Sequence, residues 1–265
     1  MHELKTFQEH LSEFLEKFDR LSGRYDHTVN NCSELEILID DYSKFITSES
    51  NKETWEQLEI LESRDFNQLL VDLRKKSALC VAIMEKYRAL KLLNGNAEIT
   101  DYFKNIESCI EEEFGSFQVT SESKVLLVGS GSFPMTPLLI AKRTGAEVVG
   151  IDIDDEAIQL GLNVVEKLGS GLDIRLEKIS VDSLDFTKDA THIIFSSTVE
   201  SKYDLLDHLH TLTNNNVVIA MRYGDRLKSL FNYPMRAVNG QKWELVEKVL
   251  RPDQVFDIAL YKKKS

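Results

Sequence analysis

The chain has 265 residues, enough for two modest domains or one large one, and its 42% of hydrophobic residues excludes a disordered protein. Acidic side chains outnumber basic ones by 44 to 32, which gives a formal net charge of -12. This charge repels phosphate backbones and anionic lipid, so we expect no nucleic-acid or membrane partner. Because the opening residues lack a signal-peptide core and no apolar run could span a bilayer, we expect a cytoplasmic protein.

The first 115 residues predict a helical bundle. Leu4, Phe7, Leu11 and Phe18 recur at spacings that place them on one stripe of an amphipathic helix. The same periodicity predicts helices over 2–22, 34–46, 66–93 and 99–114. Such stripes are packing surfaces by default, so we expect this domain, 1–115, to be all-α.

The pattern changes after Gly115, where short β-branched runs alternate with helical segments. Strands are predicted at 124–128, 147–154, 172–180, 191–197 and 216–222, and helices at 136–145, 155–169 and 204–213. The alternation predicts a doubly wound parallel sheet. Two further strands close the chain at 243–250 and 255–263, one of them antiparallel, an ending typical of class I methyltransferase-type folds. We therefore expect a Rossmann-like domain over 116–265.

Cysteine and histidine give no sign of a metal site. Cys32, Cys80 and Cys109 are far apart and odd in number, so we expect them to act as small apolar residues. His208 and His210 are two residues apart on a predicted helix and face different directions, which is poor ligand geometry. We expect a chemistry that needs no metal.

A nucleotide site is predicted where the first strand ends. Gly129, Ser130 and Gly131 form a tight turn directly after an apolar strand, where the absence of side chains lets backbone approach a ligand. Asp152 ends the next strand about 20 residues later, where a carboxylate commonly binds ribose hydroxyls. Asp152 and the adjacent Ile153 are therefore candidate cofactor-binding residues. The alternative is a tight strand–helix turn with a helix-capping aspartate.

The residues after the turn favour one nucleotide over another. A dinucleotide fold wants a third glycine at the helix start, whereas this chain has Phe133 and Pro134 there. We therefore expect S-adenosylmethionine and not NAD. Asp182, after the third strand, is placed either to meet the adenine amino group or to be a solvated turn residue. Ser196, after the fourth strand, should border the site because ligands sit at the carboxyl ends of parallel strands.

These residues resemble a known family. The segment Gly129-Ser130-Gly131, with Pro134 and Thr136 behind it, resembles the first strand–helix turn of the nicotianamine synthase family. A later segment with Arg222 and Tyr233 resembles another of its motifs, although the spacing here is one residue shorter. The resemblance covers nearly the whole chain. It implies that Pro134 and Thr136 contact S-adenosylmethionine, and that Arg222 and Tyr233 bind substrate.

The resemblance also implies a reaction. Among the family, the small bacterial members that build staphylopine-type metallophores look most similar in length. They transfer the aminobutanoyl (3-amino-3-carboxypropyl) group of S-adenosylmethionine to D-histidine and release methylthioadenosine. By the same resemblance, Glu85 and Tyr102 would line the reaction cavity.

The chemistry defines what those side chains would do. An ammonium has no lone pair, so the acceptor amine must lose a proton before it attacks. Glu85 is the expected base, with a surface carboxylate as the equal alternative; Tyr102 would orient the amine or be a core tyrosine. Arg222 suits a substrate carboxylate, or else an exposed ion pair.

Other functions stay open at this point. The first is a small-molecule N-methyltransferase on the same fold, and the second a non-enzymatic helical module fused to a degenerate nucleotide-binding domain. An NAD-dependent dehydrogenase is more distant. The sequence does not decide the stereochemistry of the acceptor or the oligomeric state, for which a homodimer is one alternative.

Overall fold

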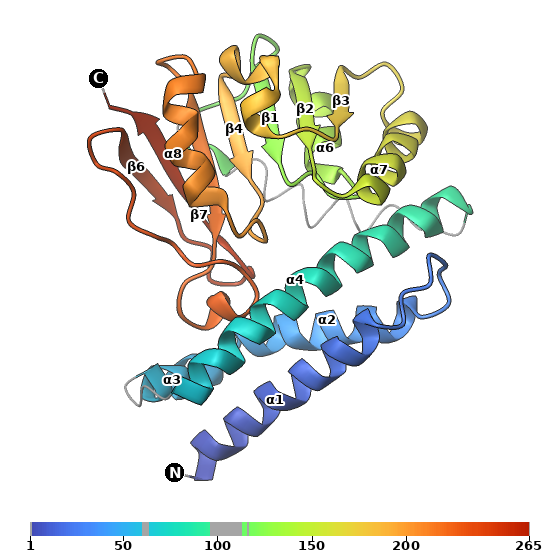
Figure 1. The fold of residues 1–265 in the computed structure, drawn as a ribbon, viewed down its shortest axis with the longest axis vertical. Helices are drawn as coiled ribbons and strands as arrows, with labels where there is room; N and C mark the ends of the chain where they lie inside the picture. Colours follow the sequence, from blue (N-terminus) through green and yellow to red (C-terminus); the bar gives the residue numbers. More distant parts are fainter. Residues whose placement is uncertain (1, 60–63, 96–112, 116, 265) are drawn as a thin grey trace. The chain divides into compact units, whose positions relative to one another are not determined.

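The computed structural model describes residues 2–59, 64–95, 113–115 and 117–264. Its first helices are α1 His2–Ser22, α2 Cys32–Thr47, α3 Glu49–Glu59 and α4 Arg64–Leu93 (Figure 1). The predictions of α1, α2 and α4 are confirmed. Helix α3 was not predicted, because only Trp55 and Leu58 among its residues supply buried apolar side chains. The helix predicted at 99–114 lies, up to residue 112, outside the described residues.

The first of two compact units contains α1, α2, α3, the part of α4 up to Tyr87, and two later pieces of the chain. It comprises Met1–Tyr87, Tyr223–Met235 and Arg251–Phe256. The piece 223–235 carries the short helix η3 Arg226–Leu230, whose Leu227 and Leu230 join the helical core. The helical unit is therefore completed by residues far along the sequence.

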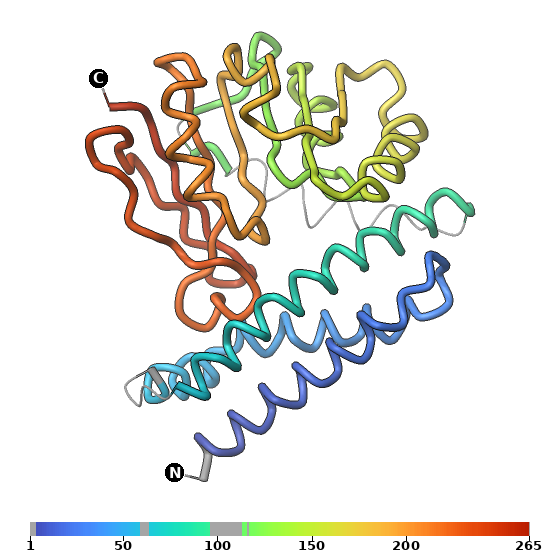
Figure 2. Tube along the Cα trace, viewed as in Figure 1, coloured from blue at the N-terminus to red at the C-terminus, as the bar shows by residue number. Residues whose placement is uncertain are grey.

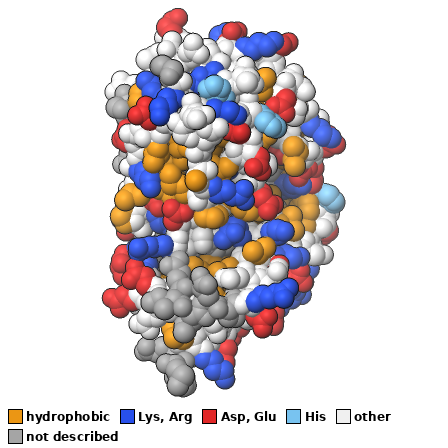
Figure 3. Space-filling model, turned by 60° about the vertical axis from the view of Figure 1, so that its left-hand side comes forward, with side chains coloured by type: hydrophobic (Ala, Val, Ile, Leu, Met, Phe, Trp, Pro, Cys, Tyr) orange, Lys and Arg blue, Asp and Glu red, His pale blue; other side chains and the backbone are white. Residues whose placement is uncertain are grey.

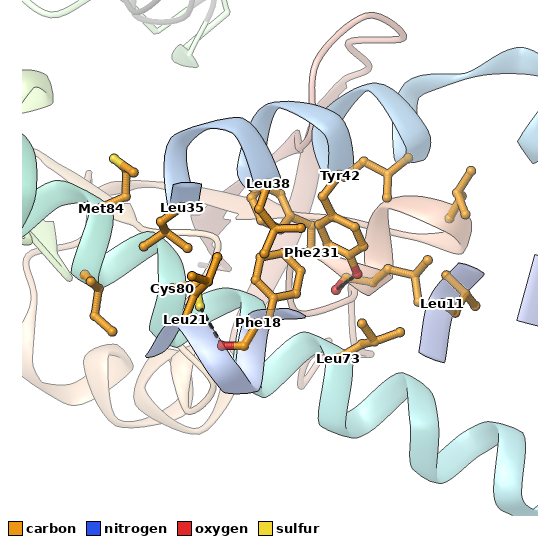
Figure 4. Close-up of a cluster of buried hydrophobic side chains, with 14 of the residues drawn as sticks. Leu11, Phe18, Leu21, Leu35, Leu38, Tyr42, Leu73, Cys80, Met84 and Phe231 are labelled. Carbon is orange, nitrogen blue, oxygen red and sulfur yellow. Dashed lines mark hydrogen bonds between the residues drawn. The ribbon is translucent and has the colours of Figure 1, made fainter. Parts of the chain in front are cut away.

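Aromatic and aliphatic side chains from α1, α2 and α4 fill the core of this unit (Figure 4). Tyr42 packs edge-on against Phe18 and Phe231, and its hydroxyl donates to the Leu230 carbonyl oxygen at 2.9 Å. The Cys80 thiol donates to the Phe18 carbonyl oxygen at 3.4 Å, and burial raises its pKa to about 12. Cys80 thus acts as the small core residue that was predicted, as does the buried Cys32; Cys109 lies outside the described residues.

The second unit, Arg88–Arg222, Arg236–Leu250 and Asp257–Ser265, holds a seven-stranded sheet. Its strands are β1 Lys124–Val128, β2 Glu147–Ile151, β3 Ile174–Glu177, β4 His192–Phe195, β5 Val218–Tyr223, β6 Trp243–Val249 and β7 Asp257–Lys263. Their order is β3-β2-β1-β4-β5-β7-β6, seen across Figure 1 from β3 on the right to β6 on the left.

The register of the sheet places the carboxyl ends of β1, β2 and β4 side by side. Strands β1 to β5 pair in parallel, and Val128 of β1 lies beside Ile151 of β2 and Phe195 of β4. The order reverses at β1, so the crevice between the ends of β1 and β4 is where such folds bind ligands. Strands β6 and β7 pair antiparallel. The predicted class I methyltransferase-type fold is confirmed.

Local sequence sets where the helices of this unit begin and end: α6 Met135–Thr144, α7 Asp155–Leu168 and α8 Lys202–Leu212. Figure 2 lets the chain be followed through this alternation with the strands. Gly145 ends α6 with φ of 75°, a left-handed conformation natural to glycine. The side chain of Asp154 accepts hydrogen bonds from the amides of Glu156 and Ala157 and so caps α7.

Phe133 anchors the turn between β1 and α6 by packing. Its ring is buried in a cluster with Leu92, Met135, Leu138 and Val164. The residue that stands where a dinucleotide fold has a third glycine therefore has a packing role. The predicted domain boundary at 115/116 stays a proposal, because most of the segment before it lies outside the described residues.

The surface carries both signs of charge. On the face drawn in Figure 3, Lys and Arg side chains are interspersed with Asp and Glu, and hydrophobic side chains lie between them. Within the described part of the chain, no helix combines the length and apolarity that a bilayer crossing requires.

Candidate functional site

The predicted glycine turn is tied to the end of β2. The amides of Gly129 and Ser130 both donate to the Ile151 carbonyl oxygen, at 2.9 and 3.0 Å. Gly129 has φ of 84° and Gly131 has φ of 65°, which residues with a Cβ rarely adopt. A Cβ on Gly129 would stand 2.7 Å from Val199 Cγ2. Both the backbone and the space at this turn therefore require glycine.

Asp152 joins the turn to the start of the next helix. Its Oδ2 accepts from the Gly131 amide at 2.9 Å, and its Oδ1 accepts from the Asp154 amide at 3.0 Å. Since Asp154 provides the helix cap, Asp152 is not the capping aspartate of the alternative interpretation. A carboxylate has about four acceptor positions. Asp152 thus keeps acceptor capacity while it fixes the turn.

Ile153 is the most exposed large hydrophobic side chain described. It is 87% exposed, directly after Asp152 at the carboxyl end of the sheet. A large apolar side chain that is exposed to water contributes no packing at this strand end, whereas a flat aromatic ligand would cover it. This exposure agrees with the predicted cofactor role of Ile153.

Three further predicted cofactor residues lie at the turn with their side chains already engaged or buried. Ser130 is buried and packs beside Gly150, and its hydroxyl has no hydrogen-bond partner among the described residues. Pro134 is the N-cap residue of α6. The Thr136 hydroxyl accepts from Arg222 Nη2 at 3.1 Å. Their contacts with a cofactor stay proposals.

Arg222, predicted to bind a substrate carboxylate, already holds one from the chain. Its Nε and Nη2 donate to the two carboxylate oxygens of Glu113 at 2.5 and 2.7 Å. Glu113 is only 1% exposed and Arg222 12%, so this is a buried bidentate pair. Together with Thr136, the pair links the segment before β1, the end of β5 and the first turn of α6. A substrate carboxylate would have to share or displace Glu113.

Ser196 and Asp182 differ in how they relate to the turn. The Ser196 amide donates to the Val128 carbonyl oxygen at 3.0 Å, which places it beside the glycine turn as predicted. Asp182 lies in the short helix η1 Val181–Ser183 and is exposed, with one oxygen 3.8 Å from Nδ1 of His208 in α8. Asp182 is therefore a solvated residue with His208 nearby, which agrees with the alternative interpretation. Its contact with adenine stays a proposal.

Two of the predicted catalytic and substrate residues, Glu85 and Tyr233, belong to the helical unit. Glu85 is half-buried in α4, between the buried Met84 and Lys86. Tyr233 is buried, and the guanidinium of Arg74 lies over its ring at 5.7 Å. Tyr102 lies outside the described residues.

Sequence reasoning missed two residues of the second unit. Glu113 stood in an acidic run that looked like a helix face, so nothing marked it as the partner of an arginine more than 100 residues away. Lys202 is fully buried at the first position of α8, whereas in the sequence a lysine just before the helix predicted at 204–213 looks like a surface residue. Only the assembled sheet shows either role.

Comparison with known proteins bears on the whole chain. Three curated relatives are named L-histidine 2-aminobutanoyltransferase: two strains of Pseudomonas aeruginosa have proteins 26% identical over 88% of both chains, and the Yersinia pestis protein is 29% identical over 86% of both. No protein-family model matches the chain. The solved structure of MtNAS in complex with MTA and tNA aligns with a TM-score of 0.76 over 98% of each chain at 16% identity.

The sheet unit has a class I methyltransferase-type fold, with a candidate nucleotide site at the ends of β1 and β2, and the chain also has a helical unit. The sequence relationship extends over both units, and the structural likeness to MtNAS shows the same fold. The predicted resemblance to the nicotianamine synthase family is thereby confirmed, and with it the prediction that the chain is an enzyme.

Proposed function

We propose that the protein transfers the aminobutanoyl group of S-adenosylmethionine to the amino group of histidine and releases methylthioadenosine. The observation that carries the proposal is the similarity to proteins named L-histidine 2-aminobutanoyltransferase over 86–88% of the chain. A likeness confined to the sheet would indicate only a shared cofactor fold. This one includes the helical unit, where Glu85 and Tyr233 lie.

The second unit supplies groups that fit S-adenosylmethionine. The turn at Gly129 and Gly131 exposes backbone, Asp152 keeps acceptor capacity for ribose hydroxyls, and Ile153 presents an apolar face for adenine. Bound there, the cofactor brings an electrophilic carbon next to a positively charged sulfur. What the chain adds is orientation, which is worth several kcal/mol in a displacement reaction.

The reaction needs one bond made, one broken and one proton removed. The acceptor nitrogen forms a bond to Cγ of the methionine moiety while the bond from that carbon to sulfur breaks, and methylthioadenosine leaves with the electron pair. Glu85 is proposed to take the ammonium proton before the attack. Glu85 is half-buried in α4, and it is the carboxylate that the resemblance assigns to the reaction cavity.

Histidine is the proposed acceptor, in a pathway to an opine-type metallophore. The name of the relatives supports L-histidine, whereas the resemblance found in the sequence implied D-histidine and a staphylopine-like product. Both enantiomers therefore belong in the assay.

The proposal is tested by incubating the protein with S-adenosylmethionine and L- or D-histidine and identifying the products by mass spectrometry. We expect methylthioadenosine together with an aminobutanoyl adduct of one enantiomer. An N-methyltransferase, the alternative on this fold, would release S-adenosylhomocysteine and methylhistidine. If neither an adduct nor methylthioadenosine forms with either enantiomer, the proposal is wrong.

Two substitutions separate cofactor binding from catalysis. Asp152→Asn should weaken S-adenosylmethionine binding by about tenfold or more, equivalent to about 1.4 kcal/mol. Its control is Asp154→Asn, which should bind normally because asparagine caps helices about as well as aspartate. Glu85→Gln should bind S-adenosylmethionine normally in calorimetry and lose turnover. Normal turnover in Glu85→Gln would place the base elsewhere.

A further inference from the structure

Lys202 is a buried cation whose hydrogen bonds reach two strands. Its side chain is 0% exposed at the first position of α8. The ammonium group donates to the backbone carbonyl oxygen of Ser197 at 3.1 Å and to that of Arg222 at 2.7 Å. A buried ammonium costs much free energy unless its donors are satisfied, so such a lysine is rare in a core.

The two carbonyls lie at the edge of the sheet where the ligand is proposed to bind. Ser197 follows β4 and Arg222 is the penultimate residue of β5, and β4 and β5 are parallel neighbours. Lys202 thus ties the carboxyl ends of two adjacent strands to the start of the helix between them.

The segment held by Lys202 on the β4 side touches the glycine turn. Ser196 donates from its amide to the Val128 carbonyl oxygen, and Val199 donates to that of Ser196. An added Cβ on Gly129 would come within 2.7 Å of Val199 and 3.1 Å of Ser196. A shift of residues 196–199 would therefore press on the turn or open a gap beside it.

On the β5 side, Lys202 fixes the backbone of the arginine that holds Glu113. The guanidinium of Arg222 also donates to Thr136, in the first turn of the helix after the glycine turn. One branch of the network therefore reaches the turn at Gly129, and the other reaches the first turn of α6, the helix that follows the glycine turn.

We propose that Lys202 is a positioning residue for the cofactor: its ammonium sets the geometry of the 196–199 loop and of Arg222 around the glycine turn. The proposal rests on the proposed binding of S-adenosylmethionine at that turn. Lys202 acts through these backbone carbonyls and takes no part in the chemistry.

The test compares Lys202→Met with wild type by isothermal calorimetry with S-adenosylmethionine, at a temperature where circular dichroism shows both folded. Lys263→Met is the matched control, because Lys263 also donates to a backbone carbonyl, that of Thr213 at the opposite end of α8. We expect Lys202→Met to raise the dissociation constant by about tenfold or more and Lys263→Met to leave it within about twofold. A role in stability alone would lower the unfolding midpoint of both variants and leave both affinities unchanged.

Lys202→Arg keeps the charge and the donors and should recover part of the affinity that Lys202→Met loses. If Lys202→Met is folded and binds like wild type, the positioning proposal is wrong. If wild type itself does not bind, the proposed function fails first. Should Lys202→Met not fold, hydrogen–deuterium exchange of wild type decides: S-adenosylmethionine should slow exchange in residues 196–202, and unchanged exchange there would overturn the proposal.

Discussion

At the scale of single residues, the buried pair of Arg222 and Glu113 is the interaction with the largest expected effect on stability. Glu113→Gln removes the negative charge and leaves the guanidinium buried beside a neutral amide. We expect a loss of about 3–5 kcal/mol in the free energy of unfolding. Urea denaturation at pH 7 measures it.

A matched ion pair shows what burial adds. Glu56 pairs with Arg226 at 2.7 Å, but the two side chains are 57% and 70% exposed. Glu56→Gln should cost no more than about 1 kcal/mol. Equal losses in the two variants would mean that the Glu113 pair is solvated.

His192, the first residue of β4, predicts a dependence of stability on pH. Burial lowers the pKa of its imidazole, which contacts Thr191 Oγ1 at 2.8 Å and the ring of Phe114. In the unfolded chain this group takes up a proton near pH 6.5, whereas in the folded protein it stays neutral to lower pH. The unfolded state then binds more protons, so stability present above about pH 6.5 falls as the pH drops through the folded pKa.

Urea titrations of wild type and His192→Gln between pH 8 and pH 5 test this. The difference in unfolding free energy between the two proteins should be constant at high pH. As the pH falls below about 6.5, wild type should lose unfolding free energy relative to His192→Gln. A difference that is independent of pH would show that His192 titrates normally in the fold.

At the scale of elements, the glycine turn after β1 can be separated into backbone strain and lack of space. Gly129 and Gly171 have φ of 84° and 82°, but an added Cβ on Gly171 meets nothing within 4 Å. Gly171→Ala should therefore lower the free energy of unfolding only by the strain of a left-handed alanine, about 1–2 kcal/mol. Gly129→Ala should lose about 1–3 kcal/mol more, because its Cβ overlaps Val199.

Cofactor affinity distinguishes the two variants further. Calorimetry should show S-adenosylmethionine bound normally by Gly171→Ala and weakly by Gly129→Ala. The turn would not be the cofactor site if Gly129→Ala, although destabilised, bound as wild type does.

Elements with a strong period were predictable from the sequence. The apolar runs before Gly129 and Asp152 gave strands, and the stripes of α1 and α4 gave helices, because one buried face imposes a period of its own. The short helix η3 has no such period. It takes its place in the helical core through Leu227 and Leu230, which no local pattern reveals.

In the candidate site, too, features with a local pattern were predictable and features without one were not. The turn and Asp152 were predictable because their chemistry is local. Glu113 and Lys202 were not, since Glu113 pairs with Arg222, 109 residues along the chain, and Lys202 bonds a carbonyl of the neighbouring strand β5.

At the scale of the whole molecule, the two tryptophans report on different units. Trp55 is buried in the helical unit and Trp243 in the sheet unit, so Trp55→Phe and Trp243→Phe leave one probe each. The pieces 223–235 and 251–256 of the helical unit are joined at both ends to chain of the sheet unit. Unfolding of the sheet unit would release residues that complete the helical core, so we expect the units to unfold together.

Urea denaturation followed by fluorescence tests this coupling. S-adenosylmethionine at about 100 times its dissociation constant should add about 2.7 kcal/mol to the unfolding free energy. The same shift should be seen by either tryptophan. A shift reported by Trp243 alone would show that the units unfold independently.

The central claim is that the protein transfers the aminobutanoyl chain and not the methyl group. The most direct measurement uses S-adenosylmethionine carrying one isotope in the methyl group and another in the aminobutanoyl chain, with histidine as acceptor. We predict that the chain label appears on histidine while the methyl label stays with methylthioadenosine. A methyl label on histidine, with the chain label left in S-adenosylhomocysteine, would contradict the account.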